Sequence, residues 1–123
     1  LDEALLTLSN IHEMVPRPTR LIEIANLQLS NNQPEAAKKT LLSLEEKFSH
    51  NASPLFNREL YANLGHAAIR LNELDEHVIY REKSLDCAVK VGNIQQMSVA
   101  GYNLGRAYQM KSRFLFLLRL KTV

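Results

Sequence analysis

The sequence predicts an all-α protein in which pairs of antiparallel helices repeat along the chain. The tripeptide Asn-Leu-Gly at 63–65 returns forty residues later at 103–105, and a fainter copy with Ala25 in place of glycine stands forty residues earlier. The turn-forming positions Asn32, Asn72 and Ser112 keep the same interval. A period of about 20–50 residues is typical of solenoids and other repeat arrays. Because valine, isoleucine and threonine dominate no window, strands are hard to place, and we expect an α-solenoid of about seven helices.

Composition and charge place the chain among ordinary globular domains. Of its 123 residues, 46% are hydrophobic and 23% are charged, and the formal net charge is +2. These values are typical of folded proteins, and so small a net charge does not favour nucleic-acid binding. The most apolar run, 114–118, is far shorter than the roughly 18 residues that a membrane-spanning helix needs. We therefore expect neither a nucleic-acid nor a membrane partner for this segment, and among compartments we favour the cytoplasm.

The start of the sequence and its single cysteine bear on its organisation. The sequence opens with Leu1 in the middle of a helical pattern, so we interpret it as a piece of a longer protein that forms one repeat domain over 1–123. Cys87 is the only cysteine, and an internal disulfide is therefore excluded.

The first two helix pairs are predicted from apolar spacing and from proline. Residues 1–15 are expected to hold the second helix of a truncated repeat, which Pro16 and Pro18 end. Repeat 1 spans 18–53, with helices expected over 19–30 and 34–49 and a turn at 31–32 between them. The residues predicted to be buried in these two helices are Leu21, Ile24, Ala25, Leu29, Ala37, Leu41, Leu44 and Phe48.

Repeat 2 spans 54–93, and repeat 3, which is also truncated, spans 94–123. In repeat 2 we expect helices over 55–71 and 75–91, the second ended by Gly92, because glycine is favoured directly after a helix. His77 and Arg81 stand where repeat 1 has alanine and leucine, which puts the packing of the second helix in doubt. In repeat 3 we expect a helix over 94–110, a turn at Lys111 and Ser112, and a further helix from 113 onwards.

The Leu-Gly pairs at 64–65 and 104–105, with Ala68 and Tyr108 three residues further on, resemble the tetratricopeptide signature. The usual period is about 34 residues, so this chain is similar to long-repeat members such as kinesin light chains and sensory segments of bacterial regulators. The resemblance implies a right-handed superhelix in which Gly65 and Gly105 let helices approach closely. It also implies a concave groove, lined by the first helix of each repeat, that binds a protein or peptide without enzymatic activity or cofactor.

Seven residues follow from this resemblance as candidates for the groove. Asn63 and Asn103 share one repeat position, where an asparagine amide holds the backbone of an extended peptide in the resembled adaptors. The plainer alternative, that both are solvated polar residues beside a packing seam, stays open. The basic side chains of the set favour an acidic segment or a C-terminal carboxylate as ligand. The set is Asn26, Asn63, His66, Arg70, Tyr102, Asn103 and Arg106, with the apolar Ile22 and Leu29 expected beside it.

No pattern in the sequence indicates catalysis or a metal site. The four histidines lack the i, i+4 spacing of a zinc helix, and neither a glycine-rich phosphate loop nor a nucleophile elbow occurs. We therefore assign no catalytic and no metal-binding residue.

The C-terminal run is apolar nearly all round a helix, which predicts burial on more than one side. It suggests an alternative to peptide binding, in which the repeats act as a spacer or as an oligomerisation arm that forms a homodimer. The residues expected to associate are Phe114, Phe116, Leu117 and Leu120. The leading hypothesis remains a peptide-binding module that serves as the sensory or adaptor segment of a larger protein, such as a bacterial regulator.

Overall fold

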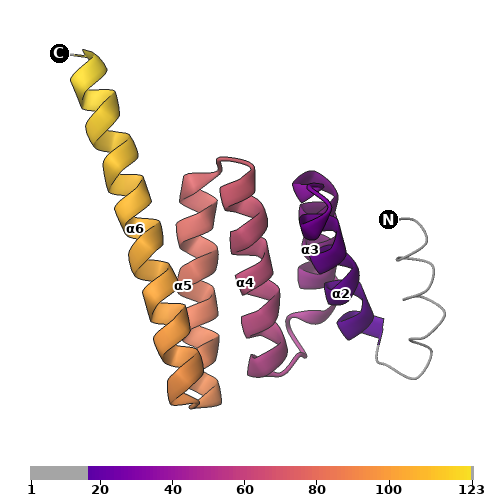
Figure 1. Ribbon diagram of the computed structural model, residues 1–123. Coiled ribbons are helices and arrows are strands. Elements are labelled where there is room, and N and C mark those ends of the chain that lie inside the picture. Colours follow the sequence, from indigo (N-terminus) through magenta and orange to yellow (C-terminus); the bar gives the residue numbers. More distant parts are fainter. Residues whose placement is uncertain (1–16, 123) are drawn as a thin grey trace.

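The computed structural model describes residues 17–122, and these residues form five helices and no strand (Figure 1). The all-α prediction is confirmed for this part of the chain. The helix expected within 1–15 lies outside the described residues. The helices are α2 (Arg17–Ser30), α3 (Pro34–Phe48), α4 (Pro54–Arg70), α5 (Leu74–Val91) and α6 (Ile94–Thr122).

The helices pack in chain order, each against the next. Contacts join α2 to α3, α3 to α4, α4 to α5 and α5 to α6, and α2 also touches α4. The first helices of the two pairs, α2 and α4, are therefore neighbours, as a stack of repeated helix pairs requires. Figure 1 shows α4 and α5 side by side and α6 continuing well beyond the end of α5.

The turns within the two pairs have the same backbone geometry. Asn32 and Asn72 are in the left-handed region, with φ of 58° and 59°. In both turns the next amide reaches back five residues to a helix carbonyl: Gln33 N donates to Gln28 O at 2.8 Å, and Glu73 N donates to Ala68 O at 2.9 Å. This is the hydrogen bond of a Schellman motif, in which a left-handed residue ends the helix. The forty-residue repeat is thus present in the backbone as well as in the sequence.

Two caps fix the starts of α4 and α6, the helices that follow the connections from one helix pair to the next. Ser53 precedes Pro54 in an extended conformation, and its side chain accepts a hydrogen bond from Phe56 N at 3.2 Å. Asn93 Oδ1 accepts from Gln96 N at 3.0 Å at the start of α6, directly after Gly92, whose φ is 79°. Side-chain acceptors at this position satisfy amides that have no partner within the helix.

The core lies where α2, α3 and α4 meet. Most of the apolar positions predicted for repeat 1 are buried there, but the predicted face of α2 needs one correction. Ile22, expected beside the groove, is only 1% exposed, whereas Ile24, expected inside, is half-buried. The core residues are Ile22, Ala25, Leu29, Ala37, Leu41, Leu44, Leu60, Leu64 and Ala67.

The turn predicted at Lys111 and Ser112 is absent, and the prediction of two helices in repeat 3 is wrong. α6 runs without a break over 29 residues. Ser112 is helical, although it stands where the first two turns have Asn32 and Asn72. Asparagine enters the left-handed region more readily than serine, because its short amide can hydrogen-bond to the local backbone. The sequence at 111–112 therefore offers the helix no favourable stop.

The continuous α6 leaves Gly105 without the close neighbour that was expected. A Cβ atom at Gly65 would lie 3.0 Å from Nε of Arg81 on α5, so this glycine does accommodate a near contact. A Cβ atom at Gly105 would meet no atom within 4 Å among the described residues. Gly65 thus leaves room for an arginine side chain and not for the backbone of a neighbouring helix. Gly105 has no close neighbour, because no helix of residues 17–122 folds back onto that face of α6.

We expect Gly105→Ala to raise the free energy of unfolding by about 0.5–1 kcal/mol, since alanine restricts the unfolded chain and fits the helix. Gly65→Ala should bring no such gain, because its methyl group would press against Arg81. Urea unfolding followed by circular dichroism measures both. A clear loss of stability in Gly105→Ala would show that another segment packs on this face.

Candidate functional site

The surface between α2 and α4 contains a depression of about 260 Å³. Its position follows from the packing described above, since these two helices are the neighbouring first helices of the two pairs. Leu29 is the apolar residue of its lining, and the other lining residues are polar. The lining residues are Asn26, Leu29, Ser30, Asn63, His66 and Arg70. The structure therefore brings together four of the seven candidate groove residues, from both helices.

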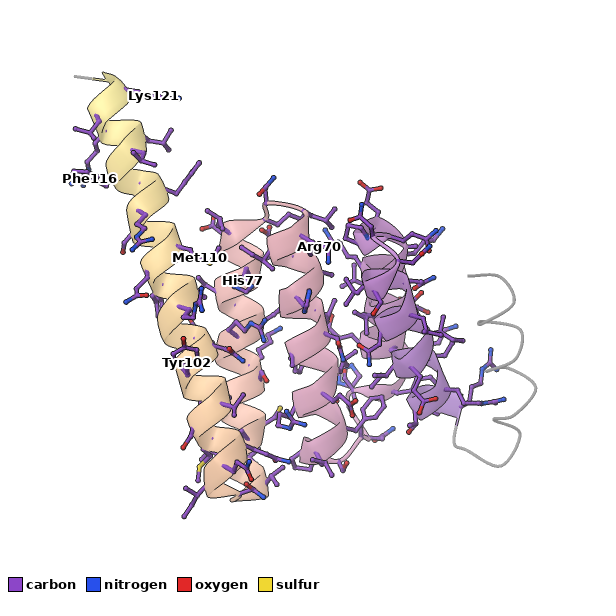
Figure 2. All side chains as sticks on the ribbon, viewed as in Figure 1. Arg70, His77, Tyr102, Met110, Phe116 and Lys121 are labelled. Atoms are coloured by element: carbon purple, nitrogen blue, oxygen red, sulfur yellow. The ribbon has the colours of Figure 1, made fainter. Side chains whose placement is uncertain are left out.

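Arg70 connects the end of α4 to the end of α2. Its Nη2 donates to Asn32 Oδ1 at 2.6 Å, and its Nη1 donates to the Leu29 carbonyl at 3.5 Å. Figure 2 shows Arg70 near the end of α4, on the side of the α2–α3 pair. The sequence suggested a ligand-binding role for Arg70 and gave no sign of this contact. The contact also holds the left-handed turn of repeat 1 in place.

Asn63 and His66 supply the hydrogen-bonding groups of the α4 wall. Asn63 Nδ2 donates to Glu59 O at 2.9 Å within its own helix, which leaves the Oδ1 atom as an acceptor. Burial, and then the positive charges of Arg81 and Arg70, lower the pKa of His66 below its ordinary value of 6.5. A neutral imidazole has one donor and one acceptor, so this wall can pair with either group of a peptide backbone.

The three candidates on α6 do not line this depression. Tyr102 and Arg106 are exposed and contact each other: the guanidinium carbon lies 5.9 Å from the ring centroid, and Arg106 Nη1 is 3.4 Å from the hydroxyl oxygen. Asn103 is half-buried on the same helix. Figure 2 shows Tyr102 on α6, separated from α2 by the width of the other helices.

A group of basic side chains surrounds Gly65 between α4 and α5. His77 is 5% exposed, and its Nδ1 lies 2.8 Å from the Gly65 carbonyl oxygen. Because a carbonyl oxygen only accepts, Nδ1 carries the hydrogen and donates it. The Arg81 side chain lies along Gly65 on the same helix pair. The expected disturbance of α5 by His77 and Arg81 is thus accommodated, since Gly65 has no side chain and its carbonyl accepts a hydrogen bond.

Sequence reasoning missed Arg81 as a candidate site residue. Its Nε is buried without a hydrogen-bond partner, and no carboxylate among residues 17–122 pairs with its guanidinium. Burial lowers the pKa of Arg81 from its ordinary value. The signal in the sequence was the arginine at the repeat position of the fully buried Leu41.

Searches for two other kinds of site gave negative results within the described part of the chain. No cluster of three or more histidine, cysteine, aspartate or glutamate side chains there could hold a metal ion. None of the helices α2 to α6 combines the length and the apolar character that crossing a membrane requires.

The buried His77 predicts a pH-dependent stability. Burial is the main cause that lowers its pKa, with smaller contributions from Arg81 and His66 against an opposing one from the Gly65 hydrogen bond. Because the pKa in the folded state is below 6.5, the unfolded chain binds more protons as the pH falls. The free energy of unfolding should therefore decrease as the pH is lowered from about 7.5 through 6.5.

Urea unfolding of wild type and His77→Gln across this range tests the assignment, since glutamine can still donate to the Gly65 carbonyl. His77→Gln should flatten the pH dependence, and His50→Gln, which changes an exposed histidine, should leave it unchanged. Equal slopes in wild type and His77→Gln would contradict the assignment.

Comparison of the chain with protein-family models, with curated protein sequences and with solved structures gave no match. Its function is therefore argued from the residues and their geometry. The feature to explain is the polar depression between α2 and α4, with the basic group around Gly65 beside it.

Proposed function

We propose that this chain is a non-enzymatic module that binds a protein or peptide segment along its α2 and α4 helices. The observation that carries the proposal is the depression lined by Asn26, Asn63, His66 and Arg70, of which Asn26 and His66 stand forty residues apart. Amide and imidazole groups offer donors and acceptors together, as binding of an extended backbone requires.

The proposal includes a tetratricopeptide-like solenoid as the architecture. Its support is the matching Schellman turns at Asn32 and Asn72, the contact between α2 and α4, and Gly65, against which the Arg81 side chain of α5 lies. In such a stack the first helices line one surface, which would place Tyr102, Asn103 and Arg106 further along the same groove. A sensory or adaptor segment of a larger protein, such as a bacterial regulator, is the role that this arrangement fits best.

Peptide display tests the function directly. Random dodecapeptides are selected on the purified chain, and the Kd of the selected peptide is measured by fluorescence anisotropy. We expect Asn63→Ala/Asn103→Ala to weaken binding about thirtyfold, because two hydrogen bonds are lost and each contributes on the order of 1 kcal/mol.

The matched control is Lys39→Ala/Glu46→Ala, which changes two exposed residues of α3 and should leave the Kd unchanged. Circular dichroism confirms that all variants are equally helical. If selection enriches no peptide, or if the groove variant binds as tightly as the control, the proposed function is wrong.

The structure offers one specific observation in favour of the alternative, an oligomerisation arm. The apolar side chains near the end of α6 are exposed: Phe114 by 50%, Phe116 by 61%, Leu117 by 57% and Leu120 by 59%. Figure 2 shows Phe116 far from α5, on the part of α6 that extends beyond the other helices. A contiguous exposed patch of this kind promotes association.

Sedimentation velocity at ~0.1 mM tests the alternative, since association depends on concentration. If α6 is an oligomerisation arm, the wild-type chain should sediment as a dimer, and the variant Phe116→Glu/Leu117→Glu should sediment as a monomer. The control Ile79→Glu/Val89→Glu, which changes apolar residues of α5 that are 48% and 56% exposed, should remain dimeric. A wild-type mass equal to one chain would exclude the oligomerisation arm.

A further inference from the structure

The charges of this chain are segregated along its sequence. All 13 acidic residues lie within 1–86, whereas residues 87–123 carry basic residues and no acidic one. Charge asymmetry of this kind indicates attraction to an acidic surface. The basic residues, all on α6 apart from the first, are Lys90, Arg106, Lys111, Arg113, Arg119 and Lys121. The projecting end of α6 is therefore positively charged as well as apolar.

The face with which α6 packs on α5 continues past α5. Ala100 and Ala107 are its buried residues, 7% and 0% exposed, and helical spacing carries the same face on to Lys111, Phe114 and Leu118. Figure 1 shows that this last part of α6 extends beyond α5. Phe114 and Leu118 are accordingly 50% and 43% exposed. Within residues 17–122, this is a helix-packing face with no helix on it.

An acidic depression of about 380 Å³ lies at the foot of this face. It is lined by residues 72–76, at the start of α5, and by Lys111, Phe114 and Leu115 of α6. The Asp75 side chain is 74% exposed, and Lys111 Nζ lies 3.0 Å from its Oδ1. Glu76 is exposed and takes part in no ion pair among the described residues. We call Asp75 and Glu76 the acidic ledge.

We propose that the acidic ledge of one copy of this chain receives the end of α6 of a second copy, so that the two α6 ends pack antiparallel about a twofold axis. The inference is independent of peptide binding between α2 and α4. It rests on the association of α6 and adds the surface that receives the helix. In a twofold pair each ledge meets the partner's helix end, so the same contact forms twice.

The length and the charges of α6 fit this arrangement. From Lys111, beside the ledge, to Lys121 near the tip is ten residues (121 − 111), or about 15 Å of helix. An antiparallel helix of equal length therefore brings its tip to the level of the ledge. At about 100° per residue, Arg119 and Lys121 lie on either side of Leu118. Apolar side chains thus occupy the middle of the contact, and basic ones lie at its margins, where the ledge can pair with them.

A membrane surface is the other acidic partner to consider, and the distribution of charge disfavours it. A helix that lies on a membrane has one apolar face and one charged face. The basic residues of the α6 end instead point to four different sides of the helix, about 80–120° apart in a helical projection. They are Lys111, Arg113, Arg119 and Lys121. A narrow apolar strip with charges at its margins suits a second helix better.

A charge-swap experiment tests the ledge. The ledge variant is Asp75→Lys/Glu76→Lys, and the tip variant is Arg119→Glu/Lys121→Glu. In sedimentation velocity at ~0.1 mM, where association depends on concentration, wild type should sediment as a dimer and each variant alone as a monomer. Like charges then meet at both contacts, and we expect the Kd of the dimer to rise by about tenfold or more.

An equimolar mixture of the two variants should restore the dimer. In the mixed pair a basic ledge meets an acidic tip, and the native ledge and tip meet at the other contact. The matched control is Glu46→Lys/Glu59→Lys, which makes the same change of charge at exposed positions of α3 and α4 and should sediment as wild type does. Circular dichroism checks that all variants are equally helical.

Each other outcome overturns the inference. A wild type that sediments as one chain excludes the oligomerisation arm as well. If wild type is a dimer but the ledge variant is one too, or the mixture stays monomeric, only the ledge is excluded. Co-sedimentation of wild type with vesicles of phosphatidylcholine and phosphatidylserine, lost in the tip variant and kept in the ledge variant, would assign the end of α6 to a membrane surface instead. Peptide selection on the α2–α4 depression is read separately from all of these results.

Discussion

The left-handed asparagine at the end of the first helix of each pair is the constraint on which the rest of the structure depends. Asn32 and Asn72 reverse the chain with nearly identical φ values, and each turn is closed by the same five-residue hydrogen bond. Because the turns are alike, α3 and α5 return along their partners in the same way, and α4 comes to lie beside α2. The polar depression between α2 and α4 is a direct consequence of that placement.

The sequence predicted most of the fold because the signals for its elements are local. The bounds of α2 to α5 follow from proline, asparagine and glycine, which act on their own backbone. Two features were predicted wrongly, the first because it depends on distant contacts and the second because a repeat position was given more weight than the residue that occupies it. The sequence did not decide which face of α2 is buried, because isoleucine stands at both 22 and 24. Only the packing of α2 against α3 and α4 shows that Ile22 is the buried one. The turn at Ser112 was inferred from its repeat position, although serine lacks the conformational preference that makes asparagine a turn residue.

The candidate site was predictable in part, and for a related reason. Side chains at equivalent positions of successive first helices lie near one another once those helices pack, which is how Asn26 and His66 come to line one surface. The contact of Arg70 with Asn32 could not be foreseen, since it joins two turns that are remote in sequence. Arg81 was expected to disturb the packing of α5, because the sequence alone does not show the space that Gly65 on α4 leaves for its side chain.

The departures from the repeat pattern are concentrated on one side of α5. His77 replaces an alanine and Arg81 replaces a leucine, and both side chains meet Gly65. The first replacement is locally satisfied, because the imidazole donates to a carbonyl that faces it. The Arg81 guanidinium is not satisfied in this way, because within residues 17–122 its Nε has no hydrogen-bond acceptor and no carboxylate pairs with it. An apolar residue at 81 would pack without that cost, as Leu41 does, so stability by itself gives no reason for an arginine here.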